Sequence, residues 1–117
     1  GIESRGFLFG APISLRLGLP FVPIRKGGKL PFEKKTARYD LEYGEDTLEI
    51  HSDAFQPGQK VLIADDLIAT GGTLEASSRL VESLNAEVVG ICVLIGLSGF
   101  GSKELLSGRK VLSVLRF

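Results

Sequence analysis

Cysteine, histidine, methionine and tryptophan are almost missing from this 117-residue chain, which has one cysteine, one histidine and none of the other two. The lone Cys92 excludes an internal disulfide, and its apolar neighbours predict an inert, buried position in a strand. His51 is also alone, which argues against a metal cluster and a serine, histidine and aspartate relay. We predict that His51 lies at a surface strand end and that no residue ligates a metal.

Net charge is absent as well, because 14 lysines and arginines balance 14 aspartates and glutamates. This balance argues against a nucleic-acid or membrane-surface protein, since both need a basic surface. No apolar run is long enough to span a bilayer, and the start of the chain does not resemble a signal peptide. We therefore predict a cytoplasmic protein. Its charge is nevertheless uneven, because six of the basic residues fall between positions 25 and 38.

The length of 117 residues predicts a single domain over residues 1–117, with roughly two thirds of the unfolded surface buried on folding. A composition of 44% hydrophobic and 24% charged residues is that of an ordinary globular protein. Because the chain begins at Gly1 and has no methionine, we expect a segment upstream of it.

A strand that runs into two carboxylates and a glycine turn is the most informative feature present. Four apolar residues from Val61 predict a strand buried on both faces of a parallel sheet. Asp65 and Asp66 follow, at the strand end where α/β proteins bind ligands. Residues 70–73, with sequence TGGT, can point several N–H groups at one anion at the start of a helix. The stretch predicts a cradle for a ribose phosphate, and the lack of a following lysine excludes a nucleotide triphosphate P-loop.

The pattern along the chain predicts an α/β fold with a mostly parallel twisted sheet flanked by helices. Thr73 is the expected N-cap of the helix that follows the glycine turn. Residues 26–35, with four lysines, predict a mobile loop. The remaining predictions are helices over residues 6–17, 73–85 and 102–106, strands over 21–25, 61–64, 88–97 and 111–115, a turn at 56–59, and a hairpin over 36–50 that turns at 44–46.

The stretch from Asp65 to Thr73 resembles the 5-phosphoribosyl pyrophosphate (PRPP) signature of type I phosphoribosyltransferases. Three further blocks occur in the order typical of the adenine phosphoribosyltransferases: GIESRGFLFG at 1–10, RKGGKLP at 25–31 and DLEYG at 40–44. The resemblance covers nearly the whole chain and is weakest after Leu97. It implies the type I fold and the transfer of a 5-phosphoribosyl group from PRPP to adenine, giving AMP and pyrophosphate. It also implies that the N-terminal hood, which closes over the purine in that family, is absent from this sequence.

The resemblance assigns roles to residues of this chain. Glu42 would be the catalytic glutamate that protonates or hydrogen-bonds N7 of the purine, with Tyr43 beside it. Asp65 and Asp66 would accept hydrogen bonds from the ribose 2′ and 3′ hydroxyls, and Leu67 would pack on the base. The 5′-phosphate would be held by the residues of the glycine turn: Ala69, Thr70, Gly71, Gly72 and Thr73.

The diphosphate is expected to meet residues from two other blocks. Residues 3–5 would form a pyrophosphate loop with a cis peptide bond between Glu3 and Ser4 and with Arg5 as a bidentate donor. Arg25, Lys26 and Lys29 would reach the pyrophosphate, from the same subunit or a neighbouring one. Without the resemblance, this run of charge reads as a solvated surface.

The resemblance further implies Mg²⁺ that arrives with the diphosphate, PRPP and adenine as small-molecule partners, and a homodimer, with no nucleic acid and no membrane partner. Two alternatives remain: a phosphoribosyltransferase for another base, and a non-catalytic PRPP or nucleotide sensor, against which Glu42 and Arg5 speak. The chain departs from the family pattern at Gly96, where a polar residue is expected, and at residues 32–34 in the loop.

Overall fold

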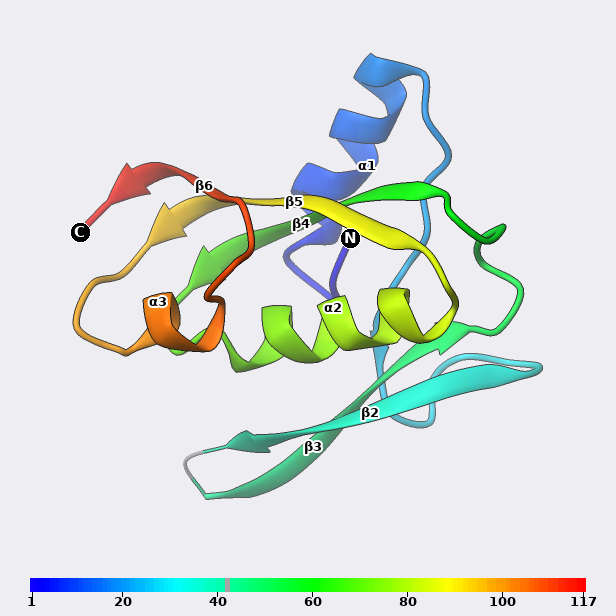
Figure 1. Cartoon of the computed structure of the whole chain (residues 1–117), viewed down its shortest axis with the longest axis horizontal. Helices are drawn as coiled ribbons and strands as arrows, with labels where there is room; N and C mark the ends of the chain where they lie inside the picture. Colours follow the sequence, from blue (N-terminus) through cyan, green and yellow to red (C-terminus); the bar gives the residue numbers. More distant parts are fainter. Residues whose placement is uncertain (42) are drawn as a thin grey trace.

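Two small sheets with one helix between them form the fold of this protein (Figure 1). The computed structural model describes residues 1–41 and 43–117. The first sheet is parallel, in the order β4-β5-β6, and the second is antiparallel, in the order β1-β3-β2. Their strands are β1 (Arg25–Lys26), β2 (Lys34–Leu41), β3 (Gly44–His51), β4 (Lys60–Ile68), β5 (Glu87–Gly96) and β6 (Val111–Arg116).

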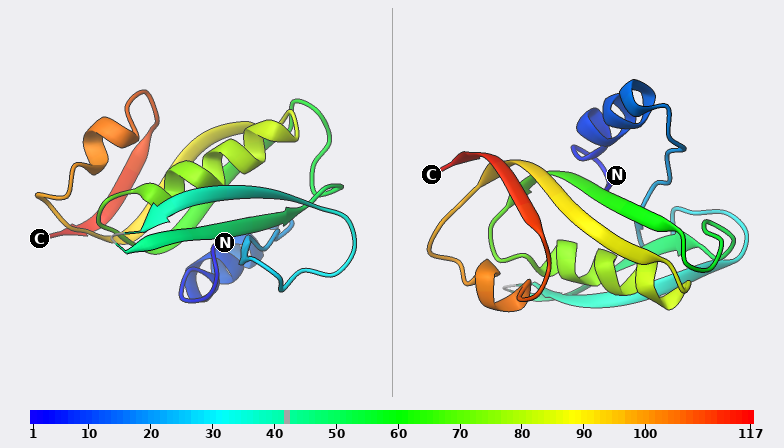
Figure 2. Two further views of the ribbon diagram at one scale, coloured as in Figure 1. Left: turned by 90° about the horizontal axis from the view of Figure 1, so that it is seen from below. Right: turned by 45° about the horizontal axis from the view of Figure 1, so that its top comes forward.

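Helices cover both faces of the parallel sheet (Figure 2). Helix α2 (Gly72–Ser83) connects β4 to β5 and packs between the two sheets, while α1 (Phe7–Leu17) packs on β4 from the opposite side. The short α3 (Ser102–Leu105) connects β5 to β6. The α/β class and the parallel sheet that the sequence predicted are confirmed, and the predicted hairpin forms most of a separate antiparallel sheet.

The first three residues join the two sheets. Ile2 lies alongside β4, where its N–H donates to the Ala64 carbonyl at 3.3 Å, and it bridges Ile24 in parallel. The Glu3 N–H donates to the Ile24 carbonyl at 2.8 Å. Because Ile24 leads directly into β1, this short stretch links the edge of the parallel sheet to the antiparallel sheet.

Helix α2 is buried on two sides because it has a sheet on each. Its buried residues are Leu74, Ala76, Ser77, Ser78, Leu80 and Val81. The Ser77 hydroxyl donates to the Thr73 carbonyl at 2.7 Å, and the Ser78 hydroxyl donates to the Leu74 carbonyl at 2.8 Å. The two hydroxyls are therefore hydrogen-bonded within the helix, as buried polar groups must be.

Several predicted boundaries are wrong, for identifiable reasons. The strand predicted over 21–25 begins only at Arg25, because the prolines at 20 and 23 lack the N–H that a sheet needs. Strand β4 continues to Ile68, so Asp65 lies within the strand and not beyond it, since β5 pairs alongside as far as Gly96. The hairpin does not turn at 44–46, because Gly44 already pairs with Leu41.

The cap of α2 also differs from the prediction. The N-cap is Gly71, with a left-handed φ of 87°, and Thr73 lies inside the first turn. Glycine adopts this φ without the steric cost that a threonine would have. Other local predictions hold: α1 ends at the left-handed Gly18, and the Gln59 N–H closes the turn onto the Gln56 carbonyl at 3.1 Å.

The two rare side chains lie in strands, as predicted. Cys92 is in β5 but only half-buried, not buried as predicted, and burial raises the pKa of its thiol. His51 is the last residue of β3 and is partly buried rather than on the surface. In the described part of the chain, no helix has both the length and the apolar character needed to cross a membrane.

The position of α2 between the sheets leads to a stability prediction. Leu80 is 2% exposed. Changing it to alanine should lower the unfolding free energy by about 2–5 kcal/mol, because the smaller side chain leaves a cavity in the core. The same change at Leu112 on β6, 61% exposed, should cost no more than about 0.5 kcal/mol. Urea denaturation of both variants measures the difference, and equal losses would contradict this placement of α2.

Candidate active site

A cavity of about 360 Å³ opens at the carboxyl end of β4, next to the start of α2. It is lined by residues 65–74 together with Glu3, Ser4, Arg5, Lys26, Tyr39 and Leu48. The predicted phosphate cradle, the predicted pyrophosphate loop and Lys26 therefore meet in a single cavity. Lys26 is the first residue of the lysine-containing loop of residues 26–34, here called the cationic loop.

The two aspartates of this cavity have unequal surroundings. Asp65 is 9% exposed, and one of its carboxylate oxygens accepts the Asp66 N–H at 2.8 Å. Burial raises the pKa of Asp65, and the neighbouring Asp66 carboxylate raises it further. Asp66 is instead paired with Arg5, whose Nε lies 2.9 Å from its Oδ2. Asp65 therefore keeps its proton to a higher pH than an exposed aspartate, while Asp66 faces a cation.

The glycine turn supplies the features of an anion site. The N-cap of helix α2, Gly71, provides no side-chain cap, and the Gly72 N–H donates to the Thr70 hydroxyl at a long 3.4 Å. The N–H groups of the first turn and the dipole of a 12-residue helix attract negative charge. At Gly71 a Cβ atom would lie 3.3 Å from the Leu106 side chain, so glycine suits both the φ and the space.

A glutamate with a buried side chain, Glu3, binds residues of the segment 25–29, here called the cationic segment. The Glu3 side chain is 5% exposed and accepts hydrogen bonds from Arg25 Nη2 at 2.8 Å, Lys29 Nζ at 3.0 Å and the Lys26 N–H at 3.0 Å. Burial would raise the pKa of Glu3, but the Lys26 N–H, Arg25 and Lys29 together outweigh it and lower the pKa to about 2. The Lys26 side chain itself pairs with Asp46 at 3.3 Å.

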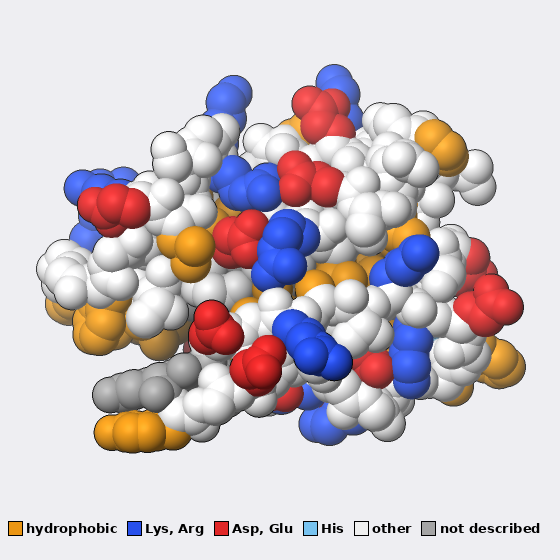
Figure 3. Space-filling model, turned by 60° about the horizontal axis from the view of Figure 1, so that its bottom comes forward, with side chains coloured by type: hydrophobic (Ala, Val, Ile, Leu, Met, Phe, Trp, Pro, Cys, Tyr) orange, Lys and Arg blue, Asp and Glu red, His pale blue; other side chains and the backbone are white. Residues whose placement is uncertain are grey.

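On the side of β2 and β3, basic and acidic side chains lie close together rather than forming a uniformly basic surface (Figure 3). The cationic segment is thus neutralised locally by carboxylates. Among residues 1–41 and 43–117, no group of three or more histidines, cysteines, aspartates and glutamates is arranged to hold a metal ion.

The predicted site residues fall into four groups. Those that line the cavity are Arg5, Lys26, Asp65, Asp66, Leu67, Ala69, Thr70, Gly71, Gly72 and Thr73. Arg25 and Lys29 are bound to Glu3 at its edge, and Tyr43 is 91% exposed and outside the lining. Glu42 lies outside the described residues. The cis peptide bond predicted between Glu3 and Ser4 is present.

Sequence reasoning missed two contributors to this cavity. The carboxylate of Glu3 acts as the acceptor for the cationic segment, and Tyr39 lines the cavity while its hydroxyl donates to Asp46 at 3.4 Å. The cations between positions 25 and 29 could have indicated a carboxylate partner, because partly buried cations need one.

The two departures from the family pattern have structural consequences. A Cβ atom at Gly96 would lie 2.6 Å from the Ser113 hydroxyl, so a polar side chain at this position requires Ser113 to move. In the loop, Phe32 has a positive φ of 63° and is 90% exposed. A positive φ is uncommon for a bulky residue.

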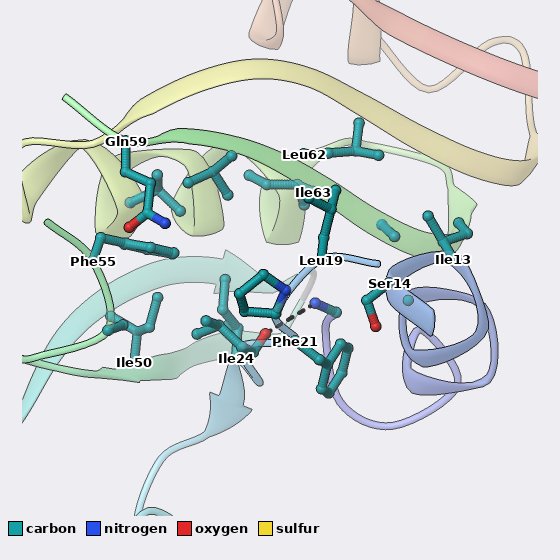
Figure 4. A pocket seen from close by; sticks show the side chains of 18 of the residues that line it. Ile13, Ser14, Leu19, Phe21, Ile24, Ile50, Phe55, Gln59, Leu62 and Ile63 are labelled. Atoms are coloured by element: carbon teal, nitrogen blue, oxygen red, sulfur yellow. Dashed lines mark hydrogen bonds between the residues drawn. The ribbon is translucent and has the colours of Figure 1, made fainter. Parts of the chain in front are cut away.

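A second hollow, of about 240 Å³, lies between α1, β4 and the segment before β1 (Figure 4). Apolar side chains dominate its lining, among them Ile13, Leu19, Phe21 and Ile63. Such a lining offers a phosphate few partners.

The low pKa of Glu3 predicts an acid-sensitive contribution to stability. Because folding lowers this pKa from 4.5 to about 2, the stabilisation is complete above pH 4.5 and is lost as the pH falls towards 2. Glu3→Gln should therefore lower the unfolding free energy at neutral pH and approach the wild type in acid. Urea denaturation of both proteins across this range tests it, with Glu87→Gln, an exposed residue of β5, as the control. A gap that does not change with pH would contradict the assignment.

Comparisons with known proteins agree with this geometry. The phosphoribosyl transferase domain model matches residues 1–107. The adenine phosphoribosyltransferase of Symbiobacterium thermophilum is 56% identical over 117 residues, which cover 100% of this chain and 69% of that protein.

Solved structures are similar as well. The adenine phosphoribosyltransferase of Thermoanaerobacter pseudethanolicus superposes with a TM-score of 0.97 at 52% identity, over 99% of this chain and 67% of that one. The Trypanosoma brucei enzyme, solved in complex with AMP, pyrophosphate and ribose-5-phosphate, has a TM-score of 0.91 at 30% identity, over 99% of this chain and 54% of that one. With its cavity, its signature and these relatives, the chain belongs to the phosphoribosyl transferase domain family and, within it, to the adenine phosphoribosyltransferases.

Proposed function

We propose that this protein transfers the 5-phosphoribosyl group of PRPP to adenine, giving AMP and pyrophosphate. The observation that carries the proposal is the single cavity in which two aspartates, the glycine turn and Arg5 meet. The ligands of the trypanosomal relative, AMP, pyrophosphate and ribose-5-phosphate, are the product, the leaving group and the sugar phosphate of this reaction.

The ribose 5-phosphate half of PRPP would bind to β4 and α2. The glycine turn would donate N–H groups to the 5′-phosphate, helped by a helix dipole worth about 0.3–1 kcal/mol. Asp65 and Asp66 would accept hydrogen bonds from the ribose hydroxyls, because an ionised carboxylate is an acceptor only and a protonated carboxyl still keeps acceptor capacity. In this structure the Arg5 guanidinium pairs with Asp66. When Asp66 accepts a ribose hydroxyl instead, Arg5 would become available to bind the diphosphate.

The diphosphate half would face the cations at the other side of the cavity. Lys26 lines the cavity, and Glu3 holds Arg25 and Lys29 at its edge. Mg²⁺ fits this arrangement as an ion that enters with the diphosphate, because it prefers hard oxygen donors, and Asp65 and Asp66 add carboxylate oxygens nearby. The ion would neutralise charge on the leaving diphosphate. The homodimer stays a prediction from the resemblance, and the cytoplasmic location stays a prediction from the sequence.

In the reaction, the bond from C1′ to the diphosphate oxygen breaks and a bond from C1′ to N9 of adenine forms, through an oxocarbenium-like sugar. No protein nucleophile is needed. Orientation of the two substrates can supply up to roughly 7–11 kcal/mol of barrier lowering, and fixed charges stabilise the separating groups. Adenine loses one N–H proton as this bond forms. Glu42 would hydrogen-bond N7 and take up that proton there as AMP forms, and it would donate the proton back to N7 in the reverse direction, an effect of about 10²–10⁴-fold.

Incubation with PRPP, Mg²⁺ and each of adenine, hypoxanthine, guanine and orotate tests the proposal. We expect nucleotide formation from adenine alone, followed chromatographically. Turnover of a different base would instead identify a phosphoribosyltransferase for that base. Thermal stabilisation by PRPP with no turnover of any base would favour a sensor, and the absence of both effects would contradict the cradle itself.

The role proposed for Glu42 predicts a selective loss. Glu42→Ala should lower kcat by about 10²–10⁴-fold while the affinity for PRPP stays unchanged, because Glu42 would contact the base and not the sugar phosphate. Glu45→Ala, an exposed residue of β3, is the matched control and should keep full activity. Loss of PRPP affinity in Glu42→Ala would show that the assigned role is wrong.

A further inference from the structure

Glu49 is a buried carboxylate that the proposed reaction does not use. It lies in β3, the middle strand of the antiparallel sheet, where it pairs with Arg25 of β1 on one side and Thr36 of β2 on the other. The residue is 4% exposed and is not part of the cavity lining. A buried carboxylate is costly unless it is paired and hydrogen-bonded, so its partners indicate its function.

The side-chain partners of Glu49 come from the loop between β1 and β2 and from Lys34, the first residue of β2. Glu49 Oε1 accepts the Leu30 N–H at 3.4 Å, and Oε2 lies 3.4 Å from Lys34 Nζ. Lys34 Nζ also donates to the Leu30 carbonyl at 3.2 Å, which closes the loop around the carboxylate. Burial would raise the pKa of Glu49, but the N–H groups of Gly28 and Leu30 and the Lys34 ammonium outweigh it and lower the pKa.

The cationic loop is therefore held by two buried carboxylates from different elements. Glu3 binds its first part, through Arg25, Lys26 and Lys29. Glu49 binds its second part, through residues 28–34. Lys29 lies between Gly28 and Leu30, whose N–H groups donate to Glu49, while its own ammonium is bound to Glu3. If the loop left Glu49, the carboxylate would lose the N–H donors of Gly28 and Leu30 and keep only Lys34 of β2, and this cost holds the loop in place.

We propose that Glu49 is a positioning residue for phosphoribosyl transfer, which holds the loop of residues 26–34 so that its lysines meet the diphosphate of PRPP. The inference rests on the proposed function and extends it to a residue that touches no substrate. Because Glu49 acts through the loop alone, it affects the diphosphate half of PRPP and not the ribose 5-phosphate half, which β4 and α2 bind.

Isothermal titration calorimetry of the protein with PRPP and with ribose 5-phosphate, both with Mg²⁺, separates the two halves. Glu49→Gln keeps the shape and an acceptor for the Leu30 N–H but removes the charge that attracts Lys34. We expect PRPP to bind roughly 2- to 30-fold more weakly, the range for residues coupled to a site through others, with ribose 5-phosphate affinity unchanged. The ratio of the two affinities reports positioning, because a general loss of folded protein would lower both alike.

Two further variants complete the experiment. Glu45→Gln, an exposed residue of the same strand, is the matched control and should leave both affinities unchanged. Lys34→Gln removes the cation while Glu49 keeps its N–H donors, so it should weaken PRPP alone and by less; it also serves if Glu49→Gln does not fold.

The outcomes distinguish a failure of the positioning role of Glu49 from a failure of the proposed function. If wild type binds both ligands and Glu49→Gln binds PRPP equally well, or weakens both ligands alike, the positioning role is overturned and the proposed function stands. If wild type binds neither ligand, the proposed function fails and this inference fails with it.

Discussion

The need of a buried carboxylate for donors is the constraint on which this structure depends. Glu3 ends the short stretch that lies alongside β4, and β1 begins opposite it. A carboxylate at 5% exposure has to be surrounded by N–H groups and cations, and Arg25, Lys26 and Lys29 are the groups that meet this need. The same contacts that join the antiparallel sheet to the parallel one therefore also bring positive charge to the cavity.

This arrangement explains why the cavity lies where three elements converge. Strand β4 contributes the aspartates, the start of α2 contributes free N–H groups, and the junction at Glu3 contributes the cations. Each feature follows from a general property of its element: side chains at the end of a parallel strand, unpaired N–H groups at the start of a helix, and charge pairing at a buried junction. A dianionic ribose phosphate with a diphosphate matches this order of groups across the cavity.

The sequence predicted the parts of the site that depend on local order in the chain. The apolar run before Asp65 and the glycines after it are contiguous, so the cradle could be read directly. It did not predict that β4 continues through Asp65 to Ile68, because this depends on pairing with β5. It also missed the carboxylates that bind the cationic loop, since Glu3 and Arg25 are 22 residues apart and meet only in the folded chain. Charge composition shows that cations need partners but not which partners they find.

Helix α2, packed between the two sheets, also governs how the molecule opens. Its buried residues serve both sheets at once, so separation of the hairpin would expose one side of the helix while the parallel sheet still covers the other. The amide hydrogens of α2 are thus shielded by two independent layers, and both must open before exchange with solvent reaches the whole helix. The turn proposed to bind the phosphate is the start of this helix, so the proposed anion site is anchored on an element that both sheets cover.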